Sequence, residues 1–416
     1  MTPPLPAPPK AAWSLLLLVS LVILGLLLRF YGYEQTWRAW GIPVAMPPFL
    51  DLRLITGSAE SMEHNFDPAL ENPNDPTQRF FNYPKLWYPF LRLGIGQRAT
   101  IPMAIASLAL YFTILAIFPR PKDWLTIALL WLVTFSSAAM LEYERCNVDI
   151  WFFVSVTTAL LLLERNALGS FFILLVSILF KIFPVFAAGM FLDKQKNRTW
   201  LYLPASLGAT AIYFLVTWKD MLTIFNITQK GKNISYGFSV APLHLRLENG
   251  INFPHMDQFF LGLVLLVSLA ALITGWKTRL ETAATDLHHL RAFWAGAAIY
   301  VGTFLLGNSW DYRLIFLLLT IPALAGWLQN PNSGFPQLIR VILISLLLSC
   351  WHTFLRHWFP TASIYYQLAF WIDETANWTL YFGLLTLLTA SLPAWLIHDT
   401  LRILRLPPPH AESNPV

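Results

Sequence analysis

The sequence predicts an all-α membrane protein with about ten to twelve transmembrane helices, and three observations lead to this fold class. Hydrophobic residues make up 56% of the chain and charged residues only 12%, whereas about a quarter of the residues in a soluble domain are charged. Apolar segments long enough to cross a bilayer as helices recur from end to end. The basic residues are scattered in short loops beside these segments, so the net charge of +5 indicates membrane topology and not nucleic-acid binding.

The predicted spans together form one transmembrane domain over 13–405. The first, 13–30, lacks the small-residue cleavage site of a secretory signal, so we expect it to remain as a helix. The others lie near 99–118, 124–141, 150–163, 201–218, 258–276, 292–307, 314–328, 338–355 and 377–397. The ends, 1–12 and 406–416, are proline-rich and polar, and we expect them to be disordered cytoplasmic tails.

The stretch 169–192 is apolar except for Lys181 and Pro184 near its middle, and basic residues flank it on both sides. Positive residues favour the cytoplasm. Two cytoplasmic flanks predict a short helical hairpin with Lys181 and Pro184 at its outer tip. A single slanted helix is the alternative.

The basic residues also predict the orientation of the chain. With the N-terminus in the cytoplasm, three short outer loops hold only Arg145, Arg313 and Arg356, and most other Lys and Arg lie inside. Both termini are then cytoplasmic, and two long loops, 31–98 and 219–257, lie outside. The first loop is rich in aromatic residues, and we expect it to fold, with helices at the membrane interface.

Acidic and amide side chains at the outer lip are the first candidates for chemistry, because charge at a membrane boundary is costly and marks function. Asp51 suits a general base, with a helix N-cap as the alternative. Glu144, Asn147 and Asp149 crowd one lip and suit a hydroxyl-rich ligand. A structural ion pair between Arg145 and Asp149, spaced i,i+4, is the other interpretation of that lip.

Cations are the second kind of candidate. Lys181 at the hairpin tip suits a phosphate as a point charge, and an incidental lysine that extends to water is the alternative. Arg313 suits bidentate binding of phosphate oxygens, although with Asp311 it also fits a polar turn that caps the next helix. The segment ITQKGKNISYGFS carries Lys230 and Lys232, and it either folds over a ligand or is solvated loop.

No Walker loop, HExxH, GxSxG or ladder of metal-ligand histidines appears in the sequence. Cys146 and Cys350 lie far apart and form no metal or redox spacing. The sequence therefore assigns no metal or other cofactor, and it leaves open whether a divalent metal is required.

Taken together, these motifs resemble the GT-C glycosyltransferases, and most closely glycosyltransferase family 87, which includes bacterial polyprenyl-phosphate-mannose-dependent mannosyltransferases. Asp51 matches the family's first-loop aspartate, and LFKIFP matches its lysine-x-x-proline hairpin. HNFDP and FNYPKLWYPF, which contains Tyr83, resemble its Asp-Pro and tyrosine-proline segments. The chain departs from the family at Lys85, where a second proline is usual, and at 146–149, where the family has a glycine-containing lip.

The resemblance implies a GT-C-like bundle with a folded first outer loop, in a bacterial inner or plasma membrane and surrounded by its lipids. It implies a hexosyltransferase that moves a sugar, mannose by analogy, from a polyprenyl-phosphate donor to a lipid or glycan acceptor on the outer face. A single displacement would invert the anomeric centre. Asp51 would be the general base, while Lys181, Arg313 and Arg53 would bind the donor phosphate.

The same resemblance implies which residues hold the sugar and the acceptor: Tyr83, Glu144, Asn147, Asp149 and Asp311. The competing class is a transporter or flippase for a lipid-linked or anionic solute. A transporter is expected to place ionisable groups near the bilayer midplane between broken helices. In this sequence, apart from Lys181, they gather at the outer lip, which favours the enzyme.

Overall fold

The computed structural model describes residues 8, 11–231, 233–330, 334–361 and 363–403. The predicted tail 406–416 lies outside the described residues, as does most of the tail 1–12. Helices form nearly all of the regular structure in the described part, and the one sheet there is a short two-stranded ladder. The all-α fold class is confirmed.

The elements of the N-terminal half are α1 Ala12–Phe30, α2 Tyr33–Ala39, α3 Leu50–Glu63, η1 Lys85–Trp87, α4 Tyr88–Leu91, η2 Gln97–Ala99, α5 Thr100–Ile117, α6 Trp124–Thr134, α7 Ser137–Arg145, α8 Asp149–Leu163, α9 Ala167–Phe180, η3 Phe183–Phe191, η4 Arg198–Leu201 and α10 Tyr202–Val216, where η denotes a 3-10 helix. The C-terminal half continues with α11 Trp218–Ile227, β1 Ser235–Tyr236, α12 Val240–Leu247, α13 Met256–Lys277, α14 Leu287–Leu305, β2 Ser309–Trp310, η5 Asp311–Leu319, α15 Ile321–Gln329, α16 Pro336–His357, α17 Ile364–Ala390 and α18 Ala394–Ile403.

Five described helices are long and apolar enough to cross a membrane, and the number rises to seven if each of two bent pairs is one span. The pairs are α6 with α7, bent by 49°, and η5 with α15, bent by 53°. α8 and α9 are apolar but shorter, with 15 and 14 residues. Each predicted span falls on helical segments, but 124–141 and 314–328 each cover a bent pair, and 377–397 runs past the end of α17 into α18. The total of ten to twelve spans remains a prediction.

At two places the structure corrects or refines a helix boundary that was predicted from the sequence. The stretch 169–192 is two helices, because α9 ends at Phe180 and Lys181 has extended backbone before η3 begins. A single continuous helix is therefore wrong. The last predicted span, 377–397, starts too late: α17 begins at Ile364, since its buried polar residues ended the apolar window without ending the helix.

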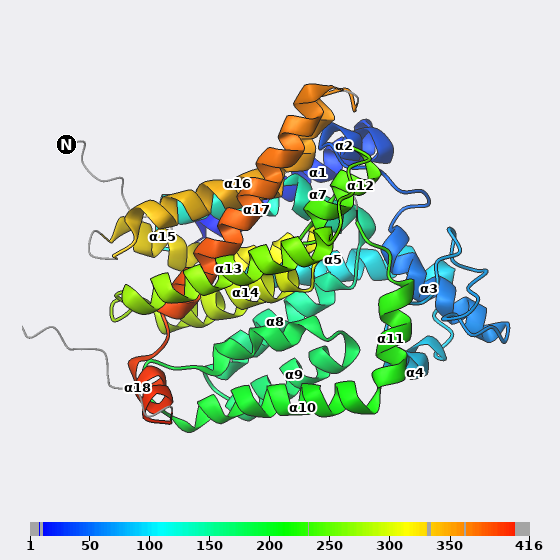
Figure 1. Ribbon diagram of the computed structural model, residues 1–416. Helices are drawn as coiled ribbons and strands as arrows, with labels where there is room; N and C mark the ends of the chain where they lie inside the picture. The colour runs from blue at the N-terminus through cyan, green and yellow to red at the C-terminus, as the bar shows by residue number, and fades with distance from the viewer. Residues whose placement is uncertain (1–7, 9–10, 232, 331–333, 362, 404–416) are drawn as a thin grey trace, which may run out of the picture.

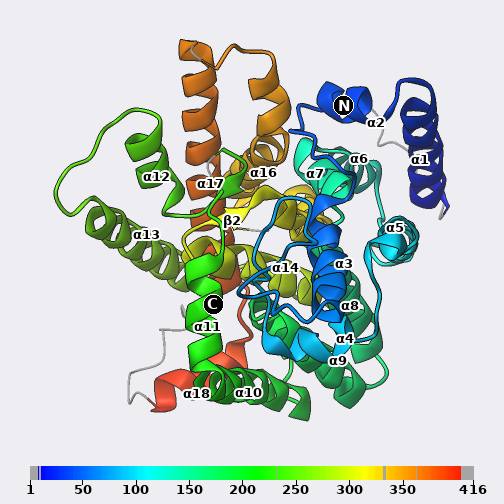
Figure 2. The same ribbon diagram turned by 90° about the vertical axis from the view of Figure 1, so that its right-hand side faces the viewer.

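The two long loops that the sequence assigns to one side lie at the same end of the helix bundle. Figure 1 shows α3, α4 and α11 at the right-hand end, with α2 and α12 above them, and α15 and α18 at the opposite end. Figure 2 views that right-hand end directly, with α1 and α5 at the edge of the bundle. Lys85 Nζ lies 3.1 Å from Asp220 Oδ1 and joins the first loop to the second.

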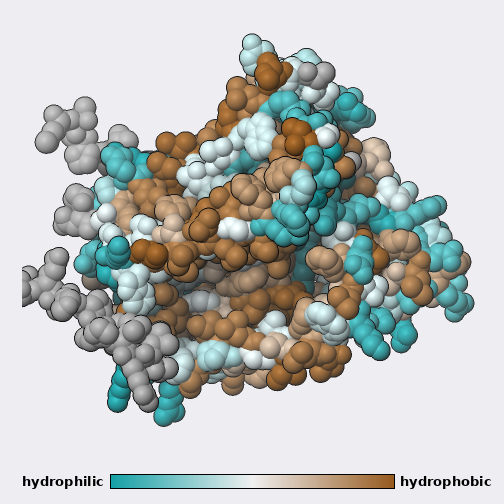
Figure 3. Space-filling model, viewed as in Figure 1, coloured by the Kyte–Doolittle hydropathy of each residue, from teal (hydrophilic) through white to brown (hydrophobic). Residues whose placement is uncertain are grey.

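The surface separates into a hydrophobic middle and hydrophilic ends. Figure 3 shows brown side chains over the central helices and teal side chains at the loop end. On α1, side chains such as Leu15, Leu18 and Val22 are more than 45% exposed, as expected of a helix that faces lipid acyl chains. The arrangement agrees with a protein that spans a membrane.

The centre of the bundle is α14, nearly all of whose residues are buried. It packs against η3, η5 and α17. At Gly302 an added Cβ would lie 2.3 Å from the ring of Phe186, so only glycine permits this approach of α14 to η3. The contact fixes the broken segment after Lys181 beside the core.

Candidate functional site

Asp51 lies in the first turn of α3, at the loop end of the bundle. The helix begins after Phe49, which has left-handed backbone (φ 62°), and no side chain caps it, so the N-cap interpretation of Asp51 is wrong. Instead Asp51 Oδ1 accepts a hydrogen bond of 2.8 Å from Arg79 Nη1, and Oδ2 accepts one of 2.9 Å from Asn147 Nδ2. The carboxylate is held in one orientation and remains 18% exposed.

Arg79 is itself held by the first loop. Its guanidinium lies 3.0 Å from Asp75 Oδ2, and it donates to the carbonyl of Leu50. Burial raises the pKa of Asp75, but hydrogen bonds and charge from Arg79 outweigh that effect and lower it below the ordinary value. Burial lowers the pKa of Arg79, and its two carboxylate partners raise it overall. The pair stays charged and ties the loop to α3.

The junction between α7 and α8 places two more candidates. Cys146 has left-handed backbone (φ 46°), which ends α7 at Arg145 and allows α8 to start at Asp149. Because the helix is interrupted, the i,i+4 pair between Arg145 and Asp149 does not form. Arg145 contacts Glu144 at 3.0 Å and the carbonyl of Pro43 at 2.7 Å.

Asp149 lies between the two cations that the sequence selected. Its Oδ1 is 2.6 Å from Lys181 Nζ, and its Oδ2 is 2.9 Å from Arg313 Nε. The side chains of Lys181 and Arg313 are only 18% and 11% exposed, so Lys181 is an ion-pair partner and not an incidental lysine extending to water. Two cations and one carboxylate leave this cluster with one net positive charge.

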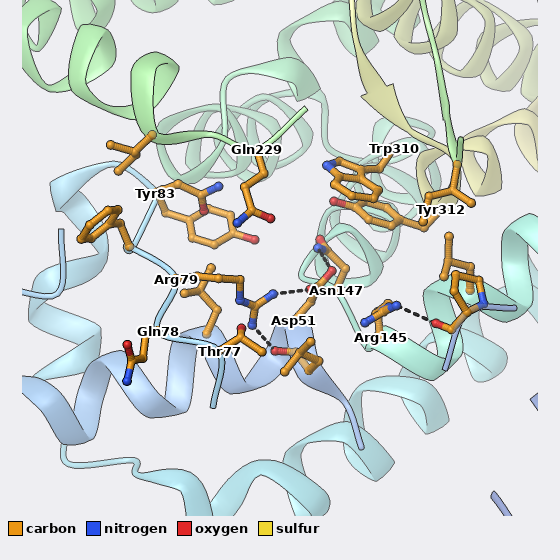
Figure 4. A pocket seen from close by; sticks show the side chains of 18 residues that line it. Asp51, Thr77, Gln78, Arg79, Tyr83, Arg145, Asn147, Gln229, Trp310 and Tyr312 are labelled. Carbon is orange, nitrogen blue, oxygen red and sulfur yellow. Dashed lines mark hydrogen bonds and ion pairs between the residues drawn. The ribbon is translucent and has the colours of Figure 1, made fainter. Parts of the chain in front are cut away.

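A cavity of about 550 Å³ opens between these elements. Figure 4 shows Asp51 and Arg79 on one wall, with Tyr83, Gln229, Trp310 and Tyr312 across from them. Their elements are α3, the first loop, the second loop and the β2–η5 segment, and the α7–α8 junction adds Arg145 and Asn147. Trp310 and Tyr312 have nearly parallel rings, 3° apart, with centroids at 6.2 Å.

The cation cluster adjoins this cavity without lining it. Asn147 bonds to Asp51 and also accepts a hydrogen bond of 3.1 Å from the backbone N–H of Asp149. Tyr83 lines the cavity, and its ring centre lies 5.1 Å from Lys181 Nζ. Asp51, Lys181 and Arg313 therefore gather at one end of the bundle, but of the three only Asp51 reaches the cavity.

Besides Lys181, Arg313 and Asp149, three further residues selected from the sequence do not line the cavity. Arg53 donates to the carbonyl of Pro48 at 2.8 Å and to the side chain of Gln97 at 2.7 Å. Glu144 is buried and accepts a hydrogen bond from the backbone N–H of Ala45. Asp311 is buried beside His352. None of these three side chains reaches a ligand in the cavity.

Sequence reasoning missed Arg79, Gln229, Trp310 and Tyr312 as lining residues. Arg79 and Gln229 lie in loops with no local pattern that marks a site. The triplet 310–312 spans the change from β2 to η5, so strand alternation does not assign its side chains to faces. In the structure Trp310 and Tyr312 line the cavity, whereas Asp311 between them is buried.

The second long loop folds against the bundle at this point. Gly231 N–H donates to Asn308 Oδ1 and Asn308 Nδ2 donates to the Gly231 carbonyl, both at 2.9 Å. β1 then pairs antiparallel with β2. The segment is therefore part of the cavity wall and not simply solvated loop. Lys230 in this segment is exposed, and Lys232 lies outside the described residues.

The described residues contain no group of three His, Cys, Asp or Glu side chains arranged to hold a metal ion. Comparison of the chain with protein-family models, curated proteins and solved structures gave no match. The function therefore has to be argued from the site itself.

Proposed function

We propose that the chain is an inverting membrane glycosyltransferase, which moves a sugar from a polyprenyl-phosphate donor to a lipid or glycan acceptor. Mannose is the sugar that the resemblance to family 87 favours. The observation that carries the proposal is the carboxylate of Asp51, held by Arg79 and Asn147 at the wall of a cavity with a cationic cluster beside it. The volume of about 550 Å³ suits a small-molecule site.

Asp51 has the geometry of a general base. A carboxylate has about four lone-pair positions, and two of them face Arg79 and Asn147. An acceptor hydroxyl on the cavity side donates to a remaining lone pair. As its oxygen attacks the anomeric carbon, its proton passes to Asp51, and the bond between the sugar and the phosphate oxygen breaks. No second carboxylate is required, because no covalent sugar–enzyme intermediate forms.

The cluster of Lys181, Asp149 and Arg313 supplies charge for the leaving group. Its single net positive charge balances the single negative charge of a phosphodiester. As the bond breaks, negative charge grows on the departing phosphate, and fixed cations at low exposure stabilise it without reorganisation. We therefore assign the donor phosphate to the side of the cavity at Tyr83, where Lys181 lies closest.

The wider architecture belongs to the same proposal. It comprises a GT-C-like bundle of about ten to twelve spans, cytoplasmic termini and an active site on the outer face of a bacterial inner or plasma membrane. The clustering of both long loops at one end of the bundle supports it. So do the buried ion pairs at that same end, since intramembrane charge marks function.

The test uses purified protein in vesicles with polyprenyl-phosphate [¹⁴C]mannose and a bacterial membrane-lipid extract as acceptor, in parallel with glucose- and arabinose-bearing donors. We expect label to leave one of these donors and appear in a new lipid or glycan product. Label that crosses the bilayer with its sugar–phosphate bond intact would instead establish the transporter or flippase. If neither sugar transfer nor crossing of the bilayer is found with any donor, both the glycosyltransferase and the transporter are contradicted.

A further inference from the structure

A second group of buried charged side chains lies behind the cavity wall. Asp311, His352, Arg356 and Asp373 are 1%, 3%, 4% and 3% exposed. His352 bridges two of them, with Nε2 at 3.3 Å from Asp311 Oδ2 and Nδ1 at 3.6 Å from Asp373 Oδ1. Burying this many ionisable groups is costly, so the cluster requires an explanation beyond packing.

Arg356 and His352 of this group contact the wall of the cavity from behind. We call the described residues of 228–234 the strap. Arg356 Nη1 donates to the carbonyl of Asn233 at 3.1 Å, and His352 Nε2 lies 3.4 Å from the same oxygen. Residues on either side of that carbonyl, Gln229 and Ile234, line the cavity.

Asp311 connects the same cluster to the aromatic wall. It lies between Trp310 and Tyr312, which both line the cavity. Its backbone N–H donates to the carbonyl of Ile234 at 3.1 Å, so the strap and the aromatic wall are joined at this residue. One buried cluster thus contacts two of the segments that shape the cavity.

The described residues of the strap are attached at both of its ends. Its N-terminal part is held by the paired hydrogen bonds of Gly231 with Asn308, and Gln229 and Lys230 before that point are exposed. Its C-terminal part is held by His352 and Arg356 at the Asn233 carbonyl and by the backbone N–H of Asp311 at the Ile234 carbonyl. The attachments of the C-terminal part thus come from the buried cluster.

We propose that His352 and Arg356 are positioning residues, which set the shape of the cavity by holding the strap through the carbonyl of Asn233. They touch no ligand themselves and act through Gln229, Ile234 and the aromatic wall. The inference relies on the proposed function only for the statement that sugar transfer takes place in this cavity.

The experiment measures the exposure of the strap directly and needs no sugar donor. In Ile234→Cys, the thiol next to Asn233 is labelled with a membrane-impermeant maleimide in full-length protein in vesicles, and mass spectrometry locates the label; Ile234 is only partly exposed in the strap. His352→Ala and Arg356→Gln are compared in this background. His352→Gln is the conservative variant, because its amide N–H can still donate to the Asn233 carbonyl. A cysteine at Asn249, exposed in the same loop beyond the strap, is the matched control.

We expect His352→Ala and Arg356→Gln to raise the labelling rate at position 234 about fivefold to tenfold, the effect of losing one hydrogen bond to the Asn233 carbonyl. His352→Gln should restore the original rate, and labelling at position 249 should not change. Cys146 and Cys350 are 1% and 0% exposed and report global unfolding.

Unchanged labelling at position 234 in both variants would overturn the proposal. Labelling of Cys146 together with position 234 would also overturn it, because the residues would then support the whole fold and not the strap. If strap labelling responds as expected while no sugar transfer is found with any donor, the proposed function fails and the positioning role stands.

Discussion

Asn147 donates a hydrogen bond of 2.9 Å to Asp51, and its own side-chain oxygen accepts from the backbone N–H of Asp149. One amide therefore joins the carboxylate in the cavity to the cluster that holds Lys181 and Arg313. The link joins α3 to the junction of α7 and α8, two segments far apart in the sequence. It explains how a candidate base and a candidate phosphate site share one end of the bundle.

Replacing Asn147 with Asp should slow sugar transfer. The substitution exchanges the amide that donates to Asp51 for a second carboxylate at hydrogen-bond distance, which repels it. Losing a hydrogen bond to a charged group should lower kcat/KM about tenfold or more. Asn147→Gln, which keeps a neutral amide donor, is the control, and a wild-type kcat/KM in Asn147→Asp would argue against the role of Asn147 in orienting Asp51.

Asp149→Asn should destabilise the protein strongly. The substitution leaves Lys181 and Arg313 buried without their carboxylate, and removing one partner of a buried ion pair costs about 3–5 kcal/mol. Thermal unfolding in detergent should show a clearly lower midpoint than wild type. The double variant Asp149→Asn with Lys181→Met removes one uncompensated charge and should recover part of the loss. Equal midpoints for wild type and Asp149→Asn would mean that the cluster is not charged as described.

Trp310→Ala should weaken binding of the sugar substrate. Trp310 exposes an aromatic surface to the cavity beside the parallel ring of Tyr312, and truncating a buried aromatic anchor typically costs about 1–2 kcal/mol in binding. We expect KM to rise about tenfold with a smaller change in kcat. Trp310→Phe should retain most of the affinity, and Trp218→Ala on exposed α11 is the control. A change in kcat alone would contradict a role in binding.

The first long loop should lose order in acid through Asp75. The folded-state pKa of this carboxyl is lowered, so its ionised form stabilises the loop above the ordinary value of 3.8, and this contribution disappears as pH falls through the lower folded-state pKa. Protection of the amides at 72–82 from hydrogen exchange, measured relative to the intrinsic exchange rate at each pH, should decrease below about pH 4 in wild type. Asp75→Asn should exchange faster already at neutral pH and show less change with acid. Identical pH profiles for both proteins would exclude this carboxyl as the cause.

The positions of the helices could be predicted from the sequence because apolar windows record which segments avoid water. Each predicted span falls on helical segments. The break between α9 and η3 occurs where Lys181 and Pro184 interrupt an otherwise apolar stretch. α17 was placed too short because Asp373 and Glu374 interrupt the apolar window. Their side chains are buried against other helices, and a window that averages local hydropathy does not register partners from distant segments.

The candidate site was predictable in part, because polar and aromatic residues beside apolar spans mark it in the sequence. Asp51, Asn147 and Tyr83 were selected and all line the cavity. Arg79 was not, because its role depends on a fold that brings residue 79 back to the start of α3. Asp311 was selected as a ligand contact, but its side chain is buried and lies 3.3 Å from His352 of α16. A partner from a distant helix leaves no mark in the local sequence.

The central claim is that Asp51 takes the proton from an acceptor hydroxyl during sugar transfer. The most direct measurement compares transfer of labelled mannose from the polyprenyl-phosphate donor by wild type, Asp51→Asn and the exposed-loop control Glu71→Gln, at equal abundance and with equal unfolding midpoints. We predict that Asp51→Asn loses about 10²-fold to 10⁴-fold in kcat while Glu71→Gln transfers at the wild-type rate. Transfer by Asp51→Asn at the wild-type rate would contradict the claim.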